Sequence, residues 1–249
     1  MRFLLRSILA LCLCAGSLPA IAAEIHLLSA GAMEPGLEPT VQGFRGATSQ
    51  AVRIRYATAP ALRQDLASGV EVDLLIAPAA LIEMLRSSGR LAGQPVPLGR
   101  VGVGVAVRPA LALPPVTSPE GLRQLVAQSQ TVVFNRASTG IYMEGLFERM
   151  GLADTVAAKA RRYPTGAEVM EHLLRGHGHE IGFGAITEIR QVQALRYLGP
   201  LPPGLQSYTT YYGAVLTGAP AATSALLQWL SGPEARGAFD AAGIEPVRR

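Results

Sequence analysis

Short apolar runs alternate with amphipathic stretches along most of this chain, and this alternation constrains its fold more than any other feature. In the first half, three aliphatic runs are each followed by a stretch with helical periodicity. A β-α-β-α-β-α order indicates parallel strands, joined by right-handed crossovers that place helices on both faces of a sheet. We expect strands at residues 25–28, 52–56 and 73–77, and helices at residues 34–47, 60–68 and 79–88.

A second series of the same kind follows a longer β-rich run at residues 99–107. We expect helices at 119–128, 138–150 and 165–175, strands at 131–134 and 180–183, a β-rich return at 207–218, and closing helices at 220–230 and 233–242. We therefore predict an α/β fold of two lobes, each a mainly parallel sheet flanked by helices, joined by two hinge strands. The predicted limits are 1–22 for a signal peptide, 23–100 with 213–249 for lobe 1, and 101–212 for lobe 2.

The first 22 residues have the pattern of a secretory signal peptide. Two arginines precede an apolar segment at residues 8–18, and Ala20-Ile21-Ala22 supplies the small residues that a signal peptidase needs. Both cysteines of the chain, Cys12 and Cys14, lie inside this segment. The mature chain, expected to start at Ala23, therefore offers no thiol nucleophile and no cysteine metal ligand.

The composition argues against a nucleic-acid binder. Removing the two arginines of the signal peptide from the 22 basic residues leaves a near balance with the 18 acidic ones, and the remaining arginines are scattered. Such a chain lacks the basic patch that phosphate backbones require. Aromatic residues make up 6% of the sequence and Trp229 is its only tryptophan, so stacking platforms for bases or sugars are hard to build.

The residues that follow the predicted strands are almost all small, hydroxylated or glycine. In open α/β sheets, ligands bind beyond the carboxyl ends of the strands, where the next helix directs its first amides at the crevice. Small residues let an anion approach these amides, and each hydroxyl adds a donor, although Ser and Thr also cap helices without binding anything. The candidate ligand-binding residues are Ser29, Ala30, Thr58, Ala77, Ser138, Thr139, Gly140, Gly166, Ala167 and Ala185.

Several segments of the mature chain resemble the periplasmic molybdate-binding proteins of ABC importers. The most telling are Q-x-x-x-x-G-x-x-x-D at residues 64–73 and SGPEARGAF at residues 231–239, together with the opening LLSAGAMEPGLEPTVQGF. The resemblance implies the type II periplasmic-binding fold, in which two lobes close on a tetrahedral oxyanion. It also implies a periplasmic monomer without catalytic residues, metal or cofactor, which delivers molybdate or tungstate to a membrane ABC permease.

This resemblance can be transferred to individual positions. Ser29 and Thr58 match the family's hydroxyl residues after the first two strands, residues 138–140 match its second-lobe helix start, and Gly166 with Ala167 match the following backbone contact. One departure matters, because the family often has a tyrosine where this chain has Ala185. Losing that hydroxyl removes a donor and enlarges the pocket, which weakens the expectation of molybdate more than the expectation of an anion.

Alternatives to an oxyanion carrier remain. Arg136, before the second-lobe helix, could pair with a carboxylate in two hydrogen bonds, which would favour a small organic acid. A secreted hydrolase would need an activated nucleophile or a metal, and the sequence suggests neither, since His177 and His179 lack a carboxylate-rich partner segment. Of the adjacent Tyr211 and Tyr212, at most one should face the cleft, because neighbouring residues of a strand point to opposite faces.

Overall fold

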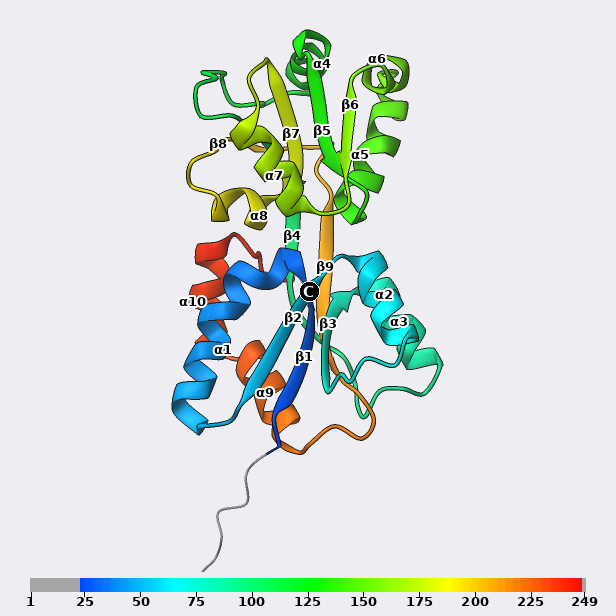
Figure 1. Ribbon diagram of the computed structural model, residues 1–249, viewed down its shortest axis with the longest axis vertical. Coiled ribbons are helices and arrows are strands. Elements are labelled where there is room, and N and C mark those ends of the chain that lie inside the picture. Colours follow the sequence, from blue (N-terminus) through cyan, green and yellow to red (C-terminus); the bar gives the residue numbers. More distant parts are fainter. Residues whose placement is uncertain (1–22, 248–249) are drawn as a thin grey trace, which may run out of the picture.

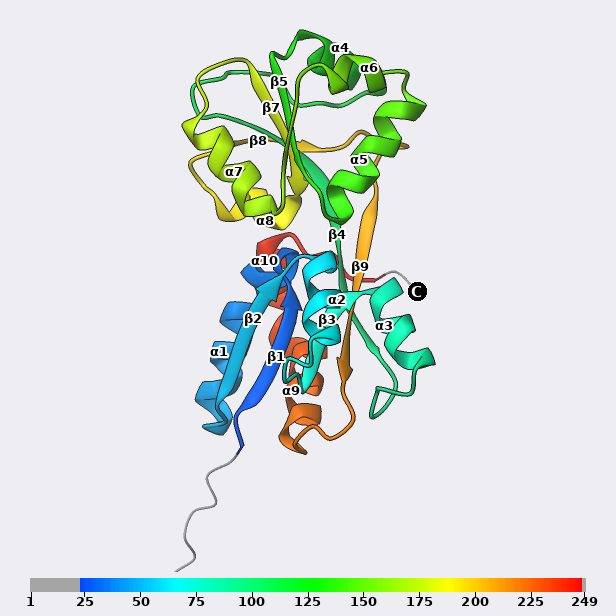
Figure 2. The same ribbon diagram turned by 45° about the vertical axis from the view of Figure 1, so that its right-hand side comes forward.

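The computed structural model describes residues 23–247, which form two groups of helices and strands stacked along the long axis (Figure 1). Two long strands, β4 (Val96–Val107) and β9 (Tyr208–Val215), run between these lobes in both views (Figures 1 and 2). All strands belong to one curled sheet of order β2-β1-β3-β9-β4-β7-β5-β6, with β8 paired to β4. The predicted α/β fold is therefore confirmed. Residues 1–22, the predicted signal peptide, lie outside the described residues.

The lower lobe contains the first three strands and five of the helices. Its strands β1 (Ile25–Ala30), β2 (Val52–Ala57) and β3 (Leu74–Pro78) are parallel, and β9 joins β3 in antiparallel pairing. Its helical elements are η1 (Gly31–Met33), α1 (Glu34–Thr48), α2 (Ala59–Ala67), α3 (Ala79–Ser87), α9 (Ala222–Ser231) and α10 (Pro233–Ala242).

The upper lobe is built around a second parallel set. In this set β5 (Thr131–Asn135) lies between β6 (Ala160–Tyr163) and β7 (Glu180–Ala185), while β4 pairs antiparallel with β7 and with β8 (Arg196–Pro200). The helices of this lobe are α4 (Pro119–Gln128), α5 (Ser138–Arg149), α6 (Ala153–Ala157), α7 (Gly166–Arg175) and α8 (Ile186–Gln191).

Every helix and strand expected from the sequence is present, with ends that differ by a few residues. Five further elements, the single 3-10 turn η1 and α6, β6, α8 and β8, were not expected. The two helices span five and six residues, too few for an apolar period to be recognised. Strand β6 is a four-residue sheet edge with two adjacent arginines, and β8 contains a glycine and ends at a proline. Such strands lack the alternation by which strands are recognised.

The hydrophobic core divides with the lobes. One buried cluster joins residues of β1, β3, α1, α9 and α10, and another lies in the upper lobe around Phe134, Phe147 and Phe183. Phe147 packs edge-on against both other rings, with centroids 5.8 and 5.5 Å away. On this division we propose the lobe limits given above, 23–100 with 213–249 and 101–212.

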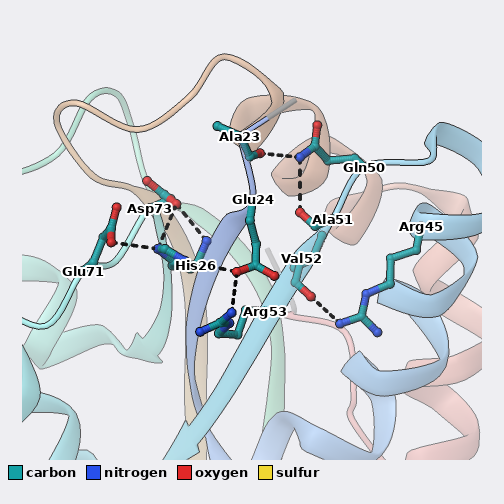
Figure 3. Close-up of polar contacts among 10 residues, drawn as sticks. All are labelled: Ala23, Glu24, His26, Arg45, Gln50, Ala51, Val52, Arg53, Glu71 and Asp73. Atoms are coloured by element: carbon teal, nitrogen blue, oxygen red, sulfur yellow. Dashed lines mark hydrogen bonds and ion pairs between the residues drawn. The ribbon is translucent and has the colours of Figure 1, made fainter. Parts of the chain in front are cut away.

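Polar contacts connect the starts of β1 and β2 with the chain that enters β3 (Figure 3). The Asp73 carboxylate is largely buried and accepts a 2.7 Å hydrogen bond from the His26 backbone N–H, which lies at the edge of strand β1. The backbones of the two residues are also joined, since the Asp73 N–H donates to the His26 carbonyl at 2.9 Å. The Asp73 side chain thus ties the chain that enters β3 to β1.

Replacing Asp73 with Ala should lower the free energy of unfolding by about 1–3 kcal/mol, because the His26 N–H then loses its buried acceptor. The measurement is urea unfolding followed by circular dichroism. Glu71→Ala is the matched control, because the Glu71 side chain is 80% exposed and meets only the His26 ring at 3.4 Å. It should change stability by less than about 0.5 kcal/mol. Equal losses in the two variants would contradict this role of Asp73.

Candidate functional site

A cavity of about 400 Å³ lies where the two lobes meet. Its wall is formed by the ends of strands and the starts of helices: residues of η1 and of the α2 start come from the lower lobe, and the starts of α5 and α7 come from the upper lobe. Tyr211 of the hinge strand β9 and Glu188 of α8 complete it. The volume lies within the range of about 300–1,000 Å³ that is typical of small-molecule sites.

Most residues singled out in the sequence meet at this cavity. Ala30 and Thr58 reach it from the lower lobe, and the others reach it from the upper lobe. The lining includes Ala30, Thr58, Ser138, Thr139, Gly166, Ala167 and Ala185. They converge because the carboxyl ends of the strands in both lobes face the same gap.

Three of the residues singled out lie behind the cavity wall. Strand β1 continues to Ala30, so Ser29 points into the core, where its hydroxyl donates to the Ala30 carbonyl at 3.2 Å. Ala77 is fully buried, and its neighbour Pro78 lines the cavity in its place. The Gly140 N–H donates to Asn135 Oδ1 at 2.9 Å, so this amide is occupied. None of the three side chains or amides is placed to meet a ligand.

Arg136 lies on the surface in the turn between β5 and α5, outside the cavity lining. Its backbone N–H donates to the Tyr163 carbonyl at 2.8 Å, which fixes the turn between two parallel strands. The pairing of Arg136 with a ligand carboxylate, expected as the basis for an organic-acid ligand, has no support from this position.

The helix starts differ in what their hydroxyl side chains do. Thr165 forms a capping box, in which its hydroxyl accepts from the Glu168 N–H and donates to the Glu168 carboxylate at 2.7 Å. Thr58 stands at the N-cap of α2 without a capping hydrogen bond from its side chain. The hydroxyls of Ser138 and Thr139 likewise make no hydrogen bond to another described residue. These three hydroxyls are therefore available to a ligand.

The cavity combines helix amides with acidic side chains. Its described lining residues include no Lys, Arg or His, so positive potential comes from the helix starts alone. Three glutamates, Glu34, Glu171 and Glu188, lie in the lining. A site built only to hold an anion gains nothing from carboxylates, so these groups need another explanation.

Glu188 is held between the two lobes. It is the third residue of α8, and its carboxylate folds back to accept a hydrogen bond from the Ala185 backbone. A Cβ at Gly166 would overlap its Oε2 atom, and a Cβ at Gly31 would lie 3.9 Å from its Oε1 atom. Gly166 of the upper lobe thus leaves the space that the carboxyl occupies, and Gly31 of the lower lobe lies beside it.

Helix α8 is fixed to both lobes, which positions Glu188. Two glycines of β4 make room for Ile186, since a Cβ at Gly102 or Gly104 would lie 3.1 Å from that side chain. The buried Thr187 hydroxyl donates to the Ala32 carbonyl of η1 at 2.7 Å. The helix is therefore anchored on the hinge strand and on the lower lobe at once.

The pKa of Glu188 is raised to about 7, mainly by burial and to a smaller extent by the negative charge of Glu34, while the hydrogen bond from the Ala185 backbone lowers it. The pKa of Glu34 is itself raised, first by burial and then by the charge of Glu38. Near neutral pH the Glu188 carboxyl exists in both protonation states, which is the property of a group that transfers protons.

Tyr211 contributes a phenol to the same cavity. Its side chain is largely buried, and its pKa is raised first by burial and then by the charge of Glu188, which lies near it. Tyr212, the next residue of β9, faces a separate hollow beside α3. The expectation that at most one of the two would face the cleft is confirmed. The phenol of Tyr211 stands in the cavity that lacks one at Ala185.

Sequence reasoning missed the acidic part of this site. Glu34 stands in the first turn of α1, where an acidic residue suits the helix dipole and does not by itself indicate a site, and Glu188 lies on α8, a helix too short to be recognised. A usable signal was present, because Glu188 follows the strand predicted at residues 180–183 by five residues, and a side chain shortly after a strand can face the same crevice as the helix amides. Within residues 23–247, no cluster of His, Asp or Glu suited to a metal ion is found, and no helix is long and apolar enough to cross a membrane.

The family model described as bacterial extracellular solute-binding protein matches residues 25–245. A curated relative, aconitate isomerase of a Pseudomonas species, is 28% identical over 246 residues, which cover 93% of this chain and 92% of that protein.

Two solved structures share the fold. The periplasmic molybdate-binding protein of Azotobacter vinelandii matches with a TM-score of 0.75 at 16% identity, covering 90% of this chain and 100% of the other. PEB3 of Campylobacter jejuni, in its L-phospholactate complex, matches with a TM-score of 0.71 at 12% identity and the same coverage.

These findings correct one expectation and narrow another. The sequence led us to expect a protein that is not an enzyme, and this expectation is contradicted by the relative named for an isomerase. The resemblance to solute-binding proteins is confirmed, whereas specificity for molybdate stays a prediction, since proteins of this fold bind anions as different as molybdate and phospholactate. Because the family model spans nearly all of the described residues, the chain belongs to the family of bacterial extracellular solute-binding proteins.

Proposed function

We propose that this protein binds a small unsaturated polycarboxylate, aconitate or a close analogue, in the cavity between its lobes and isomerises it by moving one proton. The observation that carries the proposal is Glu188, a carboxyl group with a pKa raised to about 7, placed among helix starts that attract anions. The aconitate isomerase that is 28% identical over nearly the whole chain supports the same substrate class.

The chemistry of such an isomerisation needs a single base. Aconitate carries three carboxylates on a three-carbon chain with one double bond, and rotation about that bond is blocked. Glu188 takes a proton from the methylene carbon next to a carboxylate, the double bond shifts by one carbon, and the proton returns to the former vinylic carbon. One C–H bond breaks and one forms, so the step consumes no oxidant, reductant or cofactor. A base with a pKa near the working pH suits both halves of it.

The remaining lining provides for binding. The amides at the starts of α2, α5 and α7, with the hydroxyls of Thr58, Ser138 and Thr139, donate hydrogen bonds to the carboxylates without help from a cationic side chain. Charge that develops on a carboxylate during proton removal meets the same donors, whose positions are fixed by the helices. The Tyr211 phenol adds a donor next to Glu188.

Capture of an oxyanion such as molybdate or tungstate is the second candidate, favoured by the fold shared with the Azotobacter protein. Molybdate carries no C–H bond and no proton at neutral pH, so it offers no proton that the Glu188 or Glu34 carboxyl could remove. For this reason we place the organic anion first. For either ligand we propose export through cleavage of residues 1–22, a periplasmic monomer, and contact with an ABC permease.

Purified protein without residues 1–22 should interconvert the two aconitate isomers, and Glu188→Gln should lower kcat about 10²–10⁴-fold, because the amide cannot accept the proton. The isomer ratio is followed by proton NMR, and reactions in heavy water should place deuterium in the product. Binding should survive in this variant, since Gln preserves the shape and removes a negative charge.

Glu171→Gln is the matched control, since Glu171 lines the same cavity from α7 and is not held against Gly31 and Gly166. It should keep kcat within about threefold of the parent, as expected for a group outside the proton transfer. A Glu188→Gln variant that isomerises at the parental rate would remove Glu188 from the mechanism. Binding of aconitate without any turnover by the parent would remove the isomerase proposal.

Anion affinity should rise as pH falls from about 8 to about 6, by at most about tenfold per pH unit, because protonation of one group removes one negative charge from the cavity. The direction follows from a pKa near 7: above it Glu188 is charged and repels the ligand, and below it the carboxyl is neutral. Calorimetry at several pH values measures this effect. Glu34→Gln should move the midpoint to lower pH, since Glu34 raises the Glu188 pKa, and Glu188→Gln should flatten the profile.

A further inference from the structure

Asn135 lies at the point where the upper lobe meets the cavity. It is the last residue of β5, it lines the cavity, and it is only 3% exposed. A polar side chain buried to this degree is normally hydrogen-bonded through both of its polar atoms.

The oxygen of the Asn135 side-chain amide already has two hydrogen-bond donors as partners. Asn135 Oδ1 accepts hydrogen bonds from the Ala137 N–H at 3.1 Å and the Gly140 N–H at 2.9 Å. The approach requires a glycine at position 140, because a Cβ there would overlap the Asn135 carbonyl. Only an oxygen can accept from two N–H donors, so the orientation of the amide is determined by its surroundings.

The nitrogen of the same amide has no hydrogen-bond partner among the described residues. Asn135 Nδ2 makes no hydrogen bond to another described residue, and it is not among the buried polar atoms sealed from solvent. The amide is planar, so fixing Oδ1 also fixes the direction of Nδ2. With the rest of the residue buried, the opening available to Nδ2 is the cavity that Asn135 lines.

We propose that Asn135 is a ligand-binding residue, whose Nδ2 donates a hydrogen bond to a carboxylate of the bound anion and fixes its orientation against Glu188. The inference rests on the proposed function and extends it, because it names a neutral donor from a side chain beside the helix amides. Oδ1 holds the α5 start, and Nδ2 serves the ligand. Because the side chain is already fixed, binding of the anion does not cost the entropy of ordering it.

Asn135→Asp separates these two roles. The carboxylate keeps two oxygens at the same positions, so it still accepts from Ala137 and Gly140 and places a negative charge at a helix start, which favours folding. The second oxygen replaces the donor with an acceptor that repels an anion. The variant should therefore melt at or above the parental Tm. It should bind cis- and trans-aconitate about a hundredfold or more weakly, because a charge-assisted hydrogen bond to the ligand is lost.

Two further variants complete the experiment. Gln130→Glu adds the same charge to the same lobe outside the cavity lining, at another side-chain oxygen that accepts a backbone N–H, that of His179 at 2.8 Å. It should leave the affinity within about threefold of the parent, as a distant screened charge does. Asn135→Ala removes both functions and should lower Tm and affinity together.

Calorimetry with the two aconitate isomers and with molybdate decides the outcome. If the Asn135→Asp variant binds the parent's anion with an affinity within about threefold of the parental value, the proposed role of Asn135 is overturned. A parent that binds aconitate without isomerising it overturns the isomerase proposal, while the affinity comparison still tests Asn135. A parent that binds none of the three anions overturns both proposals.

Discussion

The pairing of β4 with different partners along its length is the constraint on which the rest of the structure depends. Its first half pairs with β9 in the lower lobe, and its second half pairs with β7 and β8 in the upper lobe. One continuous strand therefore belongs to two packed units and directs the carboxyl ends of their parallel strands at a shared gap. The cavity follows from this pairing, because the helix starts that line it are attached to those strand ends.

The cavity places a carboxyl that titrates near neutral pH within a wall that attracts anions. Helix amides favour an ionised ligand, whereas burial and the neighbouring Glu34 disfavour an ionised Glu188. The two effects do not compete at one atom, because the amides lie at the starts of α2, α5 and α7 while Glu188 is held on α8. The backbone amides that attract an anion and the carboxyl that titrates near neutral pH are thus supplied by different elements of the fold.

The fold could be predicted further than the site. The long helices and buried strands follow from periodicity, and the end of β5 and the start of α7 place Ser138 and Gly166 at the cavity as expected. Ser29 lies elsewhere because β1 runs two residues past its expected end. The place of Glu188 shortly after a strand was a usable signal, but the six-residue helix that holds its carboxyl could not be predicted. The role of the Asn135 amide could not be predicted either, because it depends on hydrogen bonds between residues that the sequence cannot orient.

The buried hydrogen bond from Thr187 to the Ala32 carbonyl makes the acidity of Glu188 depend on the angle between the lobes. Any separation of the lobes that draws α8 away from η1 must break this bond and admit water beside the next residue. Hydration favours the charged form, so the carboxyl becomes a stronger acid when the lobes part and a weaker one when they meet. Release of a bound anion is then assisted by the repulsion from the charged carboxyl that appears when the lobes part.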